Sequence, residues 1–305
     1  MKVLLTGAAG QLGWELQRCV PQGVALVAMD AAGLDITDHA AVARVVAEAR
    51  PDAIINAAAY TAVDKAEAEP ERAQAVNAQG AAHLARAARA NDAFLVQVST
   101  DFIFDGASSR PYGPADPPAP LGVYGATKLA GEEAVQQVLG EGCAIVRTAW
   151  LYSSNGRNFV KTMLRLMAER EEVRVVADQI GTPTWAWGLA EAVWQITCRS
   201  LPGIHHWSDA GVASWYDFAV AIQEEALALG LLGRTIPIVP ITTAEYPTSA
   251  RRPAYSVLDK TATWALLSGP APHWRCQLRR MLREMSAEGR GQKATDPVGA
   301  ASAAT

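Results

Sequence analysis

Tyr124 and Lys128 stand four positions apart in the segment YGATK. On a helix, side chains at this spacing lie on one face and can interact. A free tyrosine has a pKa of about 10, and a neighbouring ammonium group stabilises the phenolate and lowers that pKa. The pair therefore predicts a general acid that protonates a reacting oxygen. Taken alone, the motif also fits a surface tyrosine with a chance lysine neighbour.

The polar triplet Ser99, Thr100 and Asp101 follows the apolar run Phe94–Val98, which predicts a strand. Ligands bind at the carboxyl ends of strands in open parallel sheets. Tyr124 comes 24 positions after Thr100, so a loop can bring both residues over one ligand. Ser99 has no histidine nearby in the sequence and no G-x-S-x-G pattern around it, so we do not expect a nucleophile there.

Three glycines, Gly7, Gly10 and Gly13, lie in the segment TGAAGQLG after the first apolar run. Gly7 permits a tight turn, Gly10 lets a pyrophosphate approach the backbone, and Gly13 lets a helix pack closely on a strand. The amino end of the following helix presents free N–H groups to the anion. The strand–turn–helix context favours a dinucleotide site over a purely structural turn.

Asp30 ends the next apolar run, 17 positions after Gly13, where a carboxylate accepts hydrogen bonds from the adenine ribose. This carboxylate repels a 2′-phosphate, and its neighbours Ala31, Ala32 and Gly33 offer no cation. We therefore predict that NADH is preferred and that NADPH is used less well.

The elements that must position these residues alternate between short apolar runs and helical patterns. Such alternation predicts right-handed β-α-β crossovers and a parallel sheet, with helices on both faces of strands that are apolar throughout. The expected strands are Val3–Leu5, Val24–Met29, Ala53–Ile55, Phe94–Val98 and Ala144–Val146, and the expected helices Gln11–Cys19, 38–50, Pro70–Asn91 and Val123–Leu139. The predicted fold class is α/β, a doubly wound parallel sheet (Rossmann) over residues 1–150.

The second half of the chain is less regular. Helices near Asn158–Glu169, Trp185–Cys198, Ser214–Leu229 and Pro272–Ser286, with shorter strands between them, predict a smaller α+β domain over residues 151–286. We expect this domain to bind the substrate, with some of its helices returning to the first sheet. Residues 287–305 have little to bury and are predicted to form a disordered tail.

Composition excludes several classes of protein. With 305 residues, 50% of them hydrophobic and 19% charged, the chain is globular rather than disordered. A net charge of −4 offers no bulk attraction to nucleic acid or to an anionic membrane. The sequence has no apolar stretch long enough to span a bilayer and no signal peptide. We therefore expect a cytoplasmic protein.

The cysteines and histidines show no metal or redox pattern. The four cysteines are scattered, without a C-x-x-C pair, and are expected to be reduced and buried. None of the five histidines belongs to a metal-binding set, because the adjacent His205 and His206 would point to opposite faces of a strand.

Five ordered segments resemble the extended short-chain dehydrogenase/reductase superfamily: TGAAGQLG, NAAAYTAVDKAE (56–67), STDFIFDG (99–106), YGATK (124–128) and RTAWLY (147–152). Three further matches, TGAAGQLGWELQ, DQIGTPT (178–184) and TSARRPAYSVLD (248–259), are similar to the dTDP-4-dehydrorhamnose reductase family in particular. The resemblance covers about residues 1–286.

The resemblance implies reduction of the 4-keto group of dTDP-4-dehydro-L-rhamnose to dTDP-L-rhamnose, a precursor for polysaccharides. It implies that Tyr124 protonates the carbonyl oxygen as hydride arrives from the nicotinamide. Lys128 would hold the nicotinamide ribose and lower the pKa of Tyr124, and Thr100 would hydrogen-bond the reacting oxygen. Asp101 and Trp150 would meet the sugar. The residues implied to bind the dinucleotide are Gly7, Gly10, Gln11, Leu12, Gly13, Asp30, Asp35, Ile36, Ala57, Ala58, Ala59, Tyr60, Thr61, Tyr124 and Lys128.

A nucleotide diphosphate needs cations. Arg251 and Arg252, in a proline-containing loop, are the candidates, with Arg252 expected to bind the substrate because guanidinium groups suit phosphate. The alternative is a solvated surface pair. A second group of arginines, Arg275, Arg279, Arg280 and Arg283, is expected to form one solvated helix face.

Some members of the resembled family dimerise through a magnesium ion held by three glutamates. Glu15 and Glu284 match two of these positions, but the third is Trp187, and indole is no ligand for an oxygen-preferring ion. Glu191 could substitute only if its helix were shifted. A bridging Mg²⁺ is therefore disfavoured, and the chain is expected to be a monomer or a homodimer with Trp187 in an apolar contact.

Two rival functions stay open at this stage. One is a reductase or epimerase of another nucleotide-linked 4-keto-6-deoxysugar. The other is a non-catalytic regulatory subunit, because relatives of these reductases serve as partners of methionine adenosyltransferase. The presence of Thr100, Tyr124 and Lys128 favours an enzyme.

Overall fold

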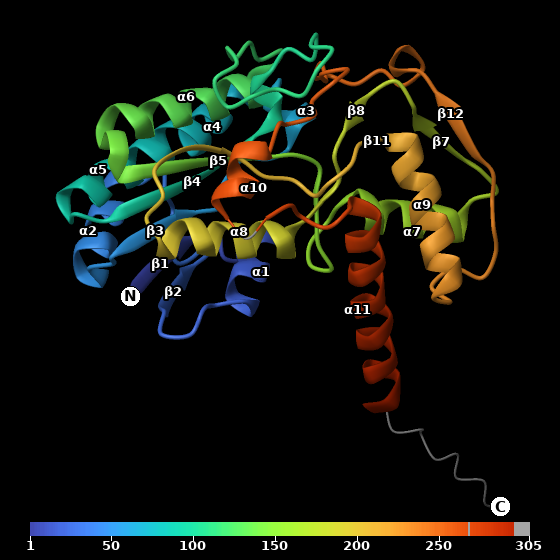
Figure 1. Ribbon diagram of the computed structural model, residues 1–305, viewed down its shortest axis with the longest axis horizontal. Helices are drawn as coiled ribbons and strands as arrows, with labels where there is room; N and C mark the ends of the chain where they lie inside the picture. Colours follow the sequence, from blue (N-terminus) through green and yellow to red (C-terminus); the bar gives the residue numbers. More distant parts are fainter. Residues whose placement is uncertain (268, 296–305) are drawn as a thin grey trace, which may run out of the picture.

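A six-stranded parallel sheet forms one half of the molecule (Figure 1). The computed structural model describes residues 1–267 and 269–295, with side chains up to residue 287. Neighbouring strands pair in parallel in the order β10-β5-β4-β3-β1-β2. The strands are β1 (Lys2–Thr6), β2 (Ala25–Met29), β3 (Ala53–Asn56), β4 (Phe94–Thr100), β5 (Cys143–Thr148) and β10 (Gly203–His206). The predicted α/β class is confirmed.

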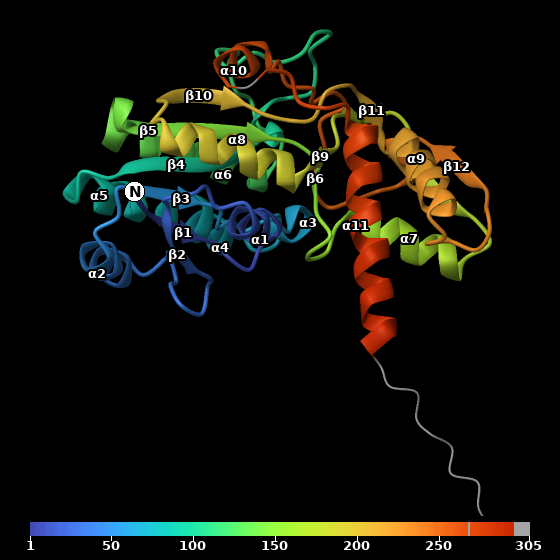
Figure 2. The ribbon, with the colours of Figure 1, turned by 60° about the horizontal axis from the view of Figure 1, so that its bottom comes forward.

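Helices cover both faces of this sheet, as Figures 1 and 2 show. Helices α1 (Gln11–Arg18) and α8 (Ala186–Cys198) pack on one face, and α2 (His39–Ala49), α5 (Gly80–Ala90) and α6 (Val123–Leu139) on the other. Consecutive strand residues therefore enter different cores: Val3 and Leu5 face α1, whereas Leu4 packs with the residues of α2 and α5. This double burial is why the strands are mostly apolar, although Gln97 in the middle of β4 is buried and polar.

The direction in which the chain adds strands to the sheet reverses between β1 and β3. After β1 the chain builds β2 at the edge and then returns past β1 to add β3, β4 and β5. Such a switch point opens a crevice at the carboxyl ends of the strands, where open α/β sheets bind their ligands.

The helix expected over Pro70–Asn91 is divided in the structure. It consists of α4 (Pro70–Gln74), a π-helical turn (Ala75–Gln79) and α5, next to a short α3 (Val63–Ala66). A Cβ added at Gly131 of α6 would lie 2.2 Å from the Asn77 carbonyl oxygen, so α6 packs directly against the backbone of the π turn.

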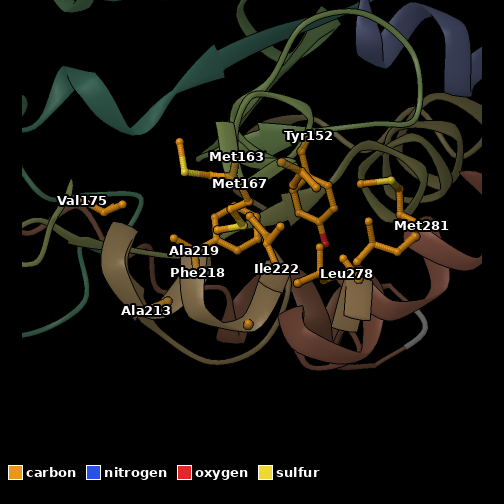
Figure 3. Packing of buried hydrophobic residues seen from close by; sticks show 14 of the residues in the cluster. Tyr152, Met163, Met167, Val175, Ala213, Phe218, Ala219, Ile222, Leu278 and Met281 are labelled. Atoms are coloured by element: carbon orange, nitrogen blue, oxygen red, sulfur yellow. The ribbon is translucent and has the colours of Figure 1, made fainter. Parts of the chain in front are cut away.

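The second half of the chain builds a smaller unit of helices and two-stranded ribbons. Its helices are α7 (Phe159–Glu169), α9 (Trp215–Ala228) and α11 (Trp274–Thr295); the strands are β7 (Val173–Val176) with β12 (Ile238–Ile241), β8 (Ile180–Gly181) with β11 (Ala213–Ser214), and β6 (Leu151–Tyr152) with β9 (Thr184–Trp185). Figure 3 shows its core, in which Tyr152, Met167, Phe218 and Leu278 pack together.

The chain does not leave the sheet for good after residue 150. Helix α8 packs against α1, and the Trp194 indole N–H donates to the Leu16 carbonyl oxygen at 3.0 Å. Strand β10 extends the sheet beside β5, and the short α10 (Thr261–Leu266) lies against β10. The smaller unit is therefore assembled from segments on both sides of α8 and β10.

Three sequence expectations need correction here. Helix α11 continues to Thr295, so the prediction of a disordered tail is wrong for residues 287–295. Each residue added to a helix that has already formed contributes one further backbone hydrogen bond, which extends α11 beyond its packed part. Residues 296–305 lie outside the described part. The four cysteines are free, but Cys198 and Cys276 are exposed rather than buried. Arg279 donates to Glu225 of α9 at 2.6 Å, so its helix face is not simply solvated. No helix among the described residues is long and apolar enough to span a bilayer.

Candidate active site

The glycine turn between β1 and α1 is built as the spacing predicted. Gly7 has φ of +75°, and a Cβ there would lie 2.5 Å from the Ala58 nitrogen. A Cβ at Gly13 would lie 2.2 Å from the Gly7 carbonyl oxygen. Gly10 forms the N-cap of α1 without any side-chain cap. The amino end of α1 therefore keeps backbone N–H groups available for an anion such as a pyrophosphate.

One side of this turn opens into a cavity of about 350 Å³. It is called the adenosine cavity below, because the residues predicted to bind the adenosine line it. The Asp30 carboxylate lies there and accepts hydrogen bonds from the Ala32 and Gly33 N–H groups at 3.0 and 2.9 Å. Asp35 accepts two hydrogen bonds from Thr37, which lower the pKa of its carboxyl. The other residues of the sequence prediction that line this cavity are Gly7, Gly10, Ile36, Ala57, Ala58, Ala59 and Tyr60.

Arg72 also lines the adenosine cavity, and sequence reasoning missed it. Its guanidinium carbon lies 5.7 Å from the centre of the Tyr60 ring, and it forms an exposed ion pair with Glu69 at 3.4 Å. Arg72 is far from Asp30 in the sequence, so no local pattern links the two. The packing of α4 beside the loop after β3 brings this cation to the cavity.

A larger cavity of about 620 Å³ lies on the other side of the turn, over the ends of β3, β4 and β5. It brings together Thr100, Asp101, Tyr124 and Lys128, although these come from different elements. The other predicted site residues on its wall are Gly10, Gln11, Leu12, Ala57, Ala58, Ala59, Thr61, Trp150 and Arg252. Of the predicted dinucleotide residues, Gly13 lines neither cavity and packs α1 on the strand instead.

Close backbone packing places Tyr124 at the end of β4. A Cβ at Gly125 would lie 2.2 Å from the Phe102 carbonyl oxygen, so the first turn of α6 sits directly on the segment after β4. The Val123 N–H donates to the Glu67 carboxylate at 2.8 Å and anchors the start of the helix. Tyr124 and Lys128 therefore face the same cavity from one helix face.

The pKa values of Tyr124 and Lys128 differ from what the sequence predicted. Burial raises the pKa of Tyr124 to about 12, with the nearby Asp101 charge adding to the rise and a hydrogen bond with Thr100 opposing it. Burial also lowers the pKa of Lys128 to about 8. The Lys128 ammonium donates to the Val98 carbonyl oxygen at 2.6 Å. The prediction that Lys128 lowers the pKa of Tyr124 is wrong in this structure, and Tyr124 keeps its proton at neutral pH.

Asp101 is a buried carboxyl group at the end of β4. It is 2% exposed, and burial raises its pKa to about 6. One carboxylate oxygen accepts from the Thr100 hydroxyl at 3.1 Å, whereas the other has no hydrogen-bond partner among the described residues. The buried hydroxyls of Ser99 and Thr148, also on the cavity wall, likewise lack partners there. Buried polar groups in folded proteins are satisfied by protein, water or ligand atoms, so these three residues are placed to bind a polar ligand.

Asn77 is a second residue that sequence reasoning missed. Its side chain accepts from the Tyr60 N–H at 2.8 Å and donates to the Tyr60 carbonyl oxygen and the Thr127 hydroxyl, both at 3.1 Å. It thereby ties the adenosine-cavity loop to the helix that carries Tyr124. A polar residue inside the alanine-rich stretch 73–90 was the only signal in the sequence.

Of the two predicted phosphate-binding arginines, Arg252 lines the larger cavity and Arg251 does not. The Arg252 guanidinium forms two hydrogen bonds with Asp64, at 2.7 and 3.0 Å, which help to lower the pKa of that carboxyl. Its charge is therefore already partly neutralised. Arg157, on the loop before α7, also reaches the cavity wall.

The residues that matched a magnesium site do not fit a metal ion here. Glu15 is fully buried and accepts from the Ser153 hydroxyl at 2.6 Å and from Arg18 at 2.7 Å. Arg18 also contacts Glu284 at 3.3 Å and lies over the Trp187 ring. A guanidinium thus occupies the space between the two carboxylates, and no group of three potential ligands occurs among the described residues.

A doubly wound sheet, a glycine turn at its switch point and a tyrosine–lysine pair beside it define a class of protein. The class is the nicotinamide-dependent short-chain dehydrogenases/reductases. More narrowly, the chain belongs to the family described as the RmlD substrate binding domain, whose model matches residues 1–287. The family resemblance found in the sequence is confirmed.

Several relatives carry the name dTDP-4-dehydrorhamnose reductase. A protein of Escherichia coli named dTDP-4-dehydrorhamnose reductase is 41% identical over 297 residues, which cover 93% of this chain and 98% of the relative. One of the same name from Streptomyces griseus is 44% identical over 281 residues, covering 90% and 91%. A crystal structure of dTDP-4-dehydrorhamnose reductase from Bacillus anthracis in complex with NADP has a TM-score of 0.88 at 40% identity, covering 93% of this chain and 99% of that one.

Proposed function

We propose that this protein is an NAD(P)H-dependent reductase that converts dTDP-4-dehydro-L-rhamnose to dTDP-L-rhamnose. One observation carries the proposal: Thr100, Tyr124 and Lys128 line one cavity together with the uncapped amino end of α1. Relatives with this name match nearly the whole chain, and the relative from Bacillus anthracis binds NADP.

The residues of the cavity divide the reaction between them. A bound reduced nicotinamide supplies the hydride that adds to C4 of the sugar. Tyr124, protonated because its pKa is about 12, donates a proton to the O4 atom, while the Thr100 hydroxyl stabilises the negative charge that develops there. Lys128 holds the nicotinamide ribose through its ammonium group. The unpaired oxygen of Asp101 accepts from a sugar hydroxyl, and Trp150 packs against the sugar.

Binding of the dinucleotide follows from the glycine turn and the adenosine cavity. The N–H groups at the start of α1 receive the pyrophosphate, and Asp30 accepts from the adenine ribose hydroxyls. We infer a preference for NADH, because the Asp30 carboxylate repels a 2′-phosphate. Arg72 is the cation on this cavity that would allow NADPH as the poorer cofactor. An Arg72→Met variant should lose kcat/KM for NADPH and keep it for NADH.

The substrate diphosphate is assigned to Arg252, held in place by Asp64. The enzyme is proposed to act in the cytoplasm as a monomer or homodimer, without nucleic acid or membrane as a partner. Arg18 stands between the two glutamates of the implied magnesium site, so neither catalysis nor assembly is assigned to a metal.

The deciding experiment follows NADH oxidation with dTDP-4-dehydro-L-rhamnose for the parent protein and for Tyr124→Phe. Tyr124→Phe should lower kcat by about 100- to 10,000-fold, the usual contribution of a general acid. Absence of turnover by the parent would refute the reductase and favour a regulatory subunit. A product with the opposite configuration at C4 would instead indicate a reductase of a different sugar, and an unchanged rate in Tyr124→Phe would refute the acid assignment.

A further inference from the structure

Trp150 adopts a backbone conformation that a tryptophan rarely takes. It follows β5 with φ of +44°, in the left-handed region. Such a conformation persists only when the surrounding structure holds it, and it marks functional sites more often than other places. The Trp150 indole lines the 620 Å³ cavity. Two neighbouring residues, Trp215 and Gly181, contact this side chain.

Trp215 holds one face of the Trp150 indole. The two rings are stacked with centroids 3.6 Å apart and an angle of 6° between their planes. Trp215 is the first residue of α9, and Ser214 fixes that start through a capping box with Asp217, with hydrogen bonds of 2.9 and 3.0 Å. Trp215 also lies on the cavity wall and contacts Phe159 with a centroid distance of 4.7 Å.

Gly181 leaves the space that the indole needs. A Cβ at Gly181 would lie 2.5 Å from Cε2, 2.6 Å from Nε1 and 2.8 Å from Cζ2 of Trp150. Strand β8, which carries Gly181, pairs with β11, and Gly181 lies opposite Ala213 two residues before Trp215. Strand β11 leads directly into Trp215 and is paired with the strand of Gly181, so the two residues form a slot, contacting the indole from positions that are fixed relative to each other.

We propose that Trp215 and Gly181 are positioning residues that hold the Trp150 indole as the wall of the sugar-nucleotide subsite. This inference rests on the proposed reductase function. A 6-deoxyhexose has an apolar methyl group and C–H groups that pack well on the part of Trp150 that faces the cavity beside Trp215 and Gly181. A fixed indole keeps the sugar ring in one orientation above Thr100 and Tyr124, so that O4 stays within reach of the proton donor.

Gly181→Ala tests the slot directly. The backbone at Gly181 has no positive φ, so the added methyl group acts only by displacing the indole. We expect KM for dTDP-4-dehydro-L-rhamnose to rise by about tenfold or more, and KM for NADH to stay within about twofold. Gly233→Ala is the matched control, because a Cβ there meets nothing within 4 Å. Trp215→Leu should reproduce the loss, and Trp215→Phe should restore most of the affinity.

A double-mutant cycle shows whether these residues act through Trp150. In a Trp150→Ala background the indole is gone, so Gly181→Ala should add no further rise in KM. The same rise in both backgrounds, or an unchanged KM in Gly181→Ala, would overturn the proposal. Parallel increases of both KM values would do so as well, because they would indicate general damage to the fold.

Two readouts separate this proposal from the reductase assignment. A stacked indole pair gives a near-ultraviolet circular dichroism signal that Trp150→Ala, Trp215→Leu and Gly181→Ala should abolish and Gly233→Ala should keep. Calorimetry gives the affinity for dTDP-L-rhamnose without turnover, and only the first three variants should weaken it. If the parent binds this ligand but does not reduce the keto sugar, the reductase assignment fails and the slot stands. If the spectrum or the affinity is unaffected in Gly181→Ala, the slot is refuted.

Discussion

The alkaline limb of the pH–rate profile should report Lys128 and not Tyr124. Burial lowers the pKa of Lys128 to about 8 and raises that of Tyr124 to about 12. The proposed reaction requires protonated forms of both residues, because Lys128 is assigned to hold the nicotinamide ribose and Tyr124 to donate the proton. Because Lys128 loses its charge about four pH units earlier, its deprotonation limits the rate first.

The size of the effect follows from the titration of a single group. At pH 9, one unit above the pKa of Lys128, only about one tenth of the molecules keep the ammonium charge, so kcat/KM for NADH falls about tenfold for each further pH unit. Over the same interval Tyr124, with a pKa of about 12, stays protonated. A limb set by Tyr124 alone would leave the rate constant up to about pH 11.

The assay measures kcat/KM for NADH between pH 6 and 10 at constant ionic strength, because this quantity reports groups of the free enzyme. Lys128→Arg keeps a positive charge throughout this range and should remove the limb near pH 8. If the larger arginine side chain prevents cofactor binding, the pH profile of the residual activity of Tyr124→Phe is measured instead. This variant retains Lys128, so the decrease in rate near pH 8 should persist. A flat parent profile to pH 10, or loss of the limb in Tyr124→Phe, would refute the reasoning.

Three further predictions concern stability and cofactor binding. Gly13→Ala should abolish NADH binding measured by calorimetry and lower the free energy of unfolding by about 1–3 kcal/mol, because its Cβ would lie 2.2 Å from a carbonyl oxygen. The buried Arg147 guanidinium lies 2.7 Å from a Glu132 oxygen, and Glu132→Gln removes that counter-charge. Urea unfolding should show that the free energy of unfolding falls by about 3–5 kcal/mol. In the control Glu169→Gln, at an exposed position, it should stay within about 0.5 kcal/mol. The pKa of Asp101 is about 6 in the folded protein, above the 3.8 of the free group. The contribution of Asp101 to the free energy of unfolding is therefore complete below pH 3.8 and is lost as pH rises through 6. The free energy of unfolding of Asp101→Asn should rise relative to the parent by up to about 3 kcal/mol between pH 4 and 7, and a gain that does not depend on pH would contradict this.

Local patterns were enough for the sheet and for the catalytic pair. Each strand of the first half is centred on a mostly apolar run between turn residues, so its position could be predicted without knowledge of its neighbours. Tyr124 and Lys128 share a helix face however the helix packs, and Gly13 must be glycine because its Cβ would meet the Gly7 carbonyl oxygen in the same turn. These properties depend on residues close in the sequence.

Properties that depend on distant neighbours could not be predicted in this way. The pKa of Tyr124 was expected to fall because only Lys128 is close in sequence, but burial in the folded protein raises it. Arg72 reaches the adenosine cavity through the packing of α4 beside Tyr60. Arg252 was expected to offer a free charge, yet the fold places Asp64 within 2.7 Å of it.

The sequence by itself therefore determined the fold class, the glycine turn and the tyrosine–lysine pair that is proposed to act in catalysis, because these follow from residue type and short spacing. Only the tertiary structure decided the protonation states of Tyr124, Lys128 and Asp101, since desolvation is a property of the assembled cavity. It also decided how Trp150 is held. Gly181 lies in β8 and Trp215 begins α9 directly after β11, so both meet the indole only after β8 and β11 have paired.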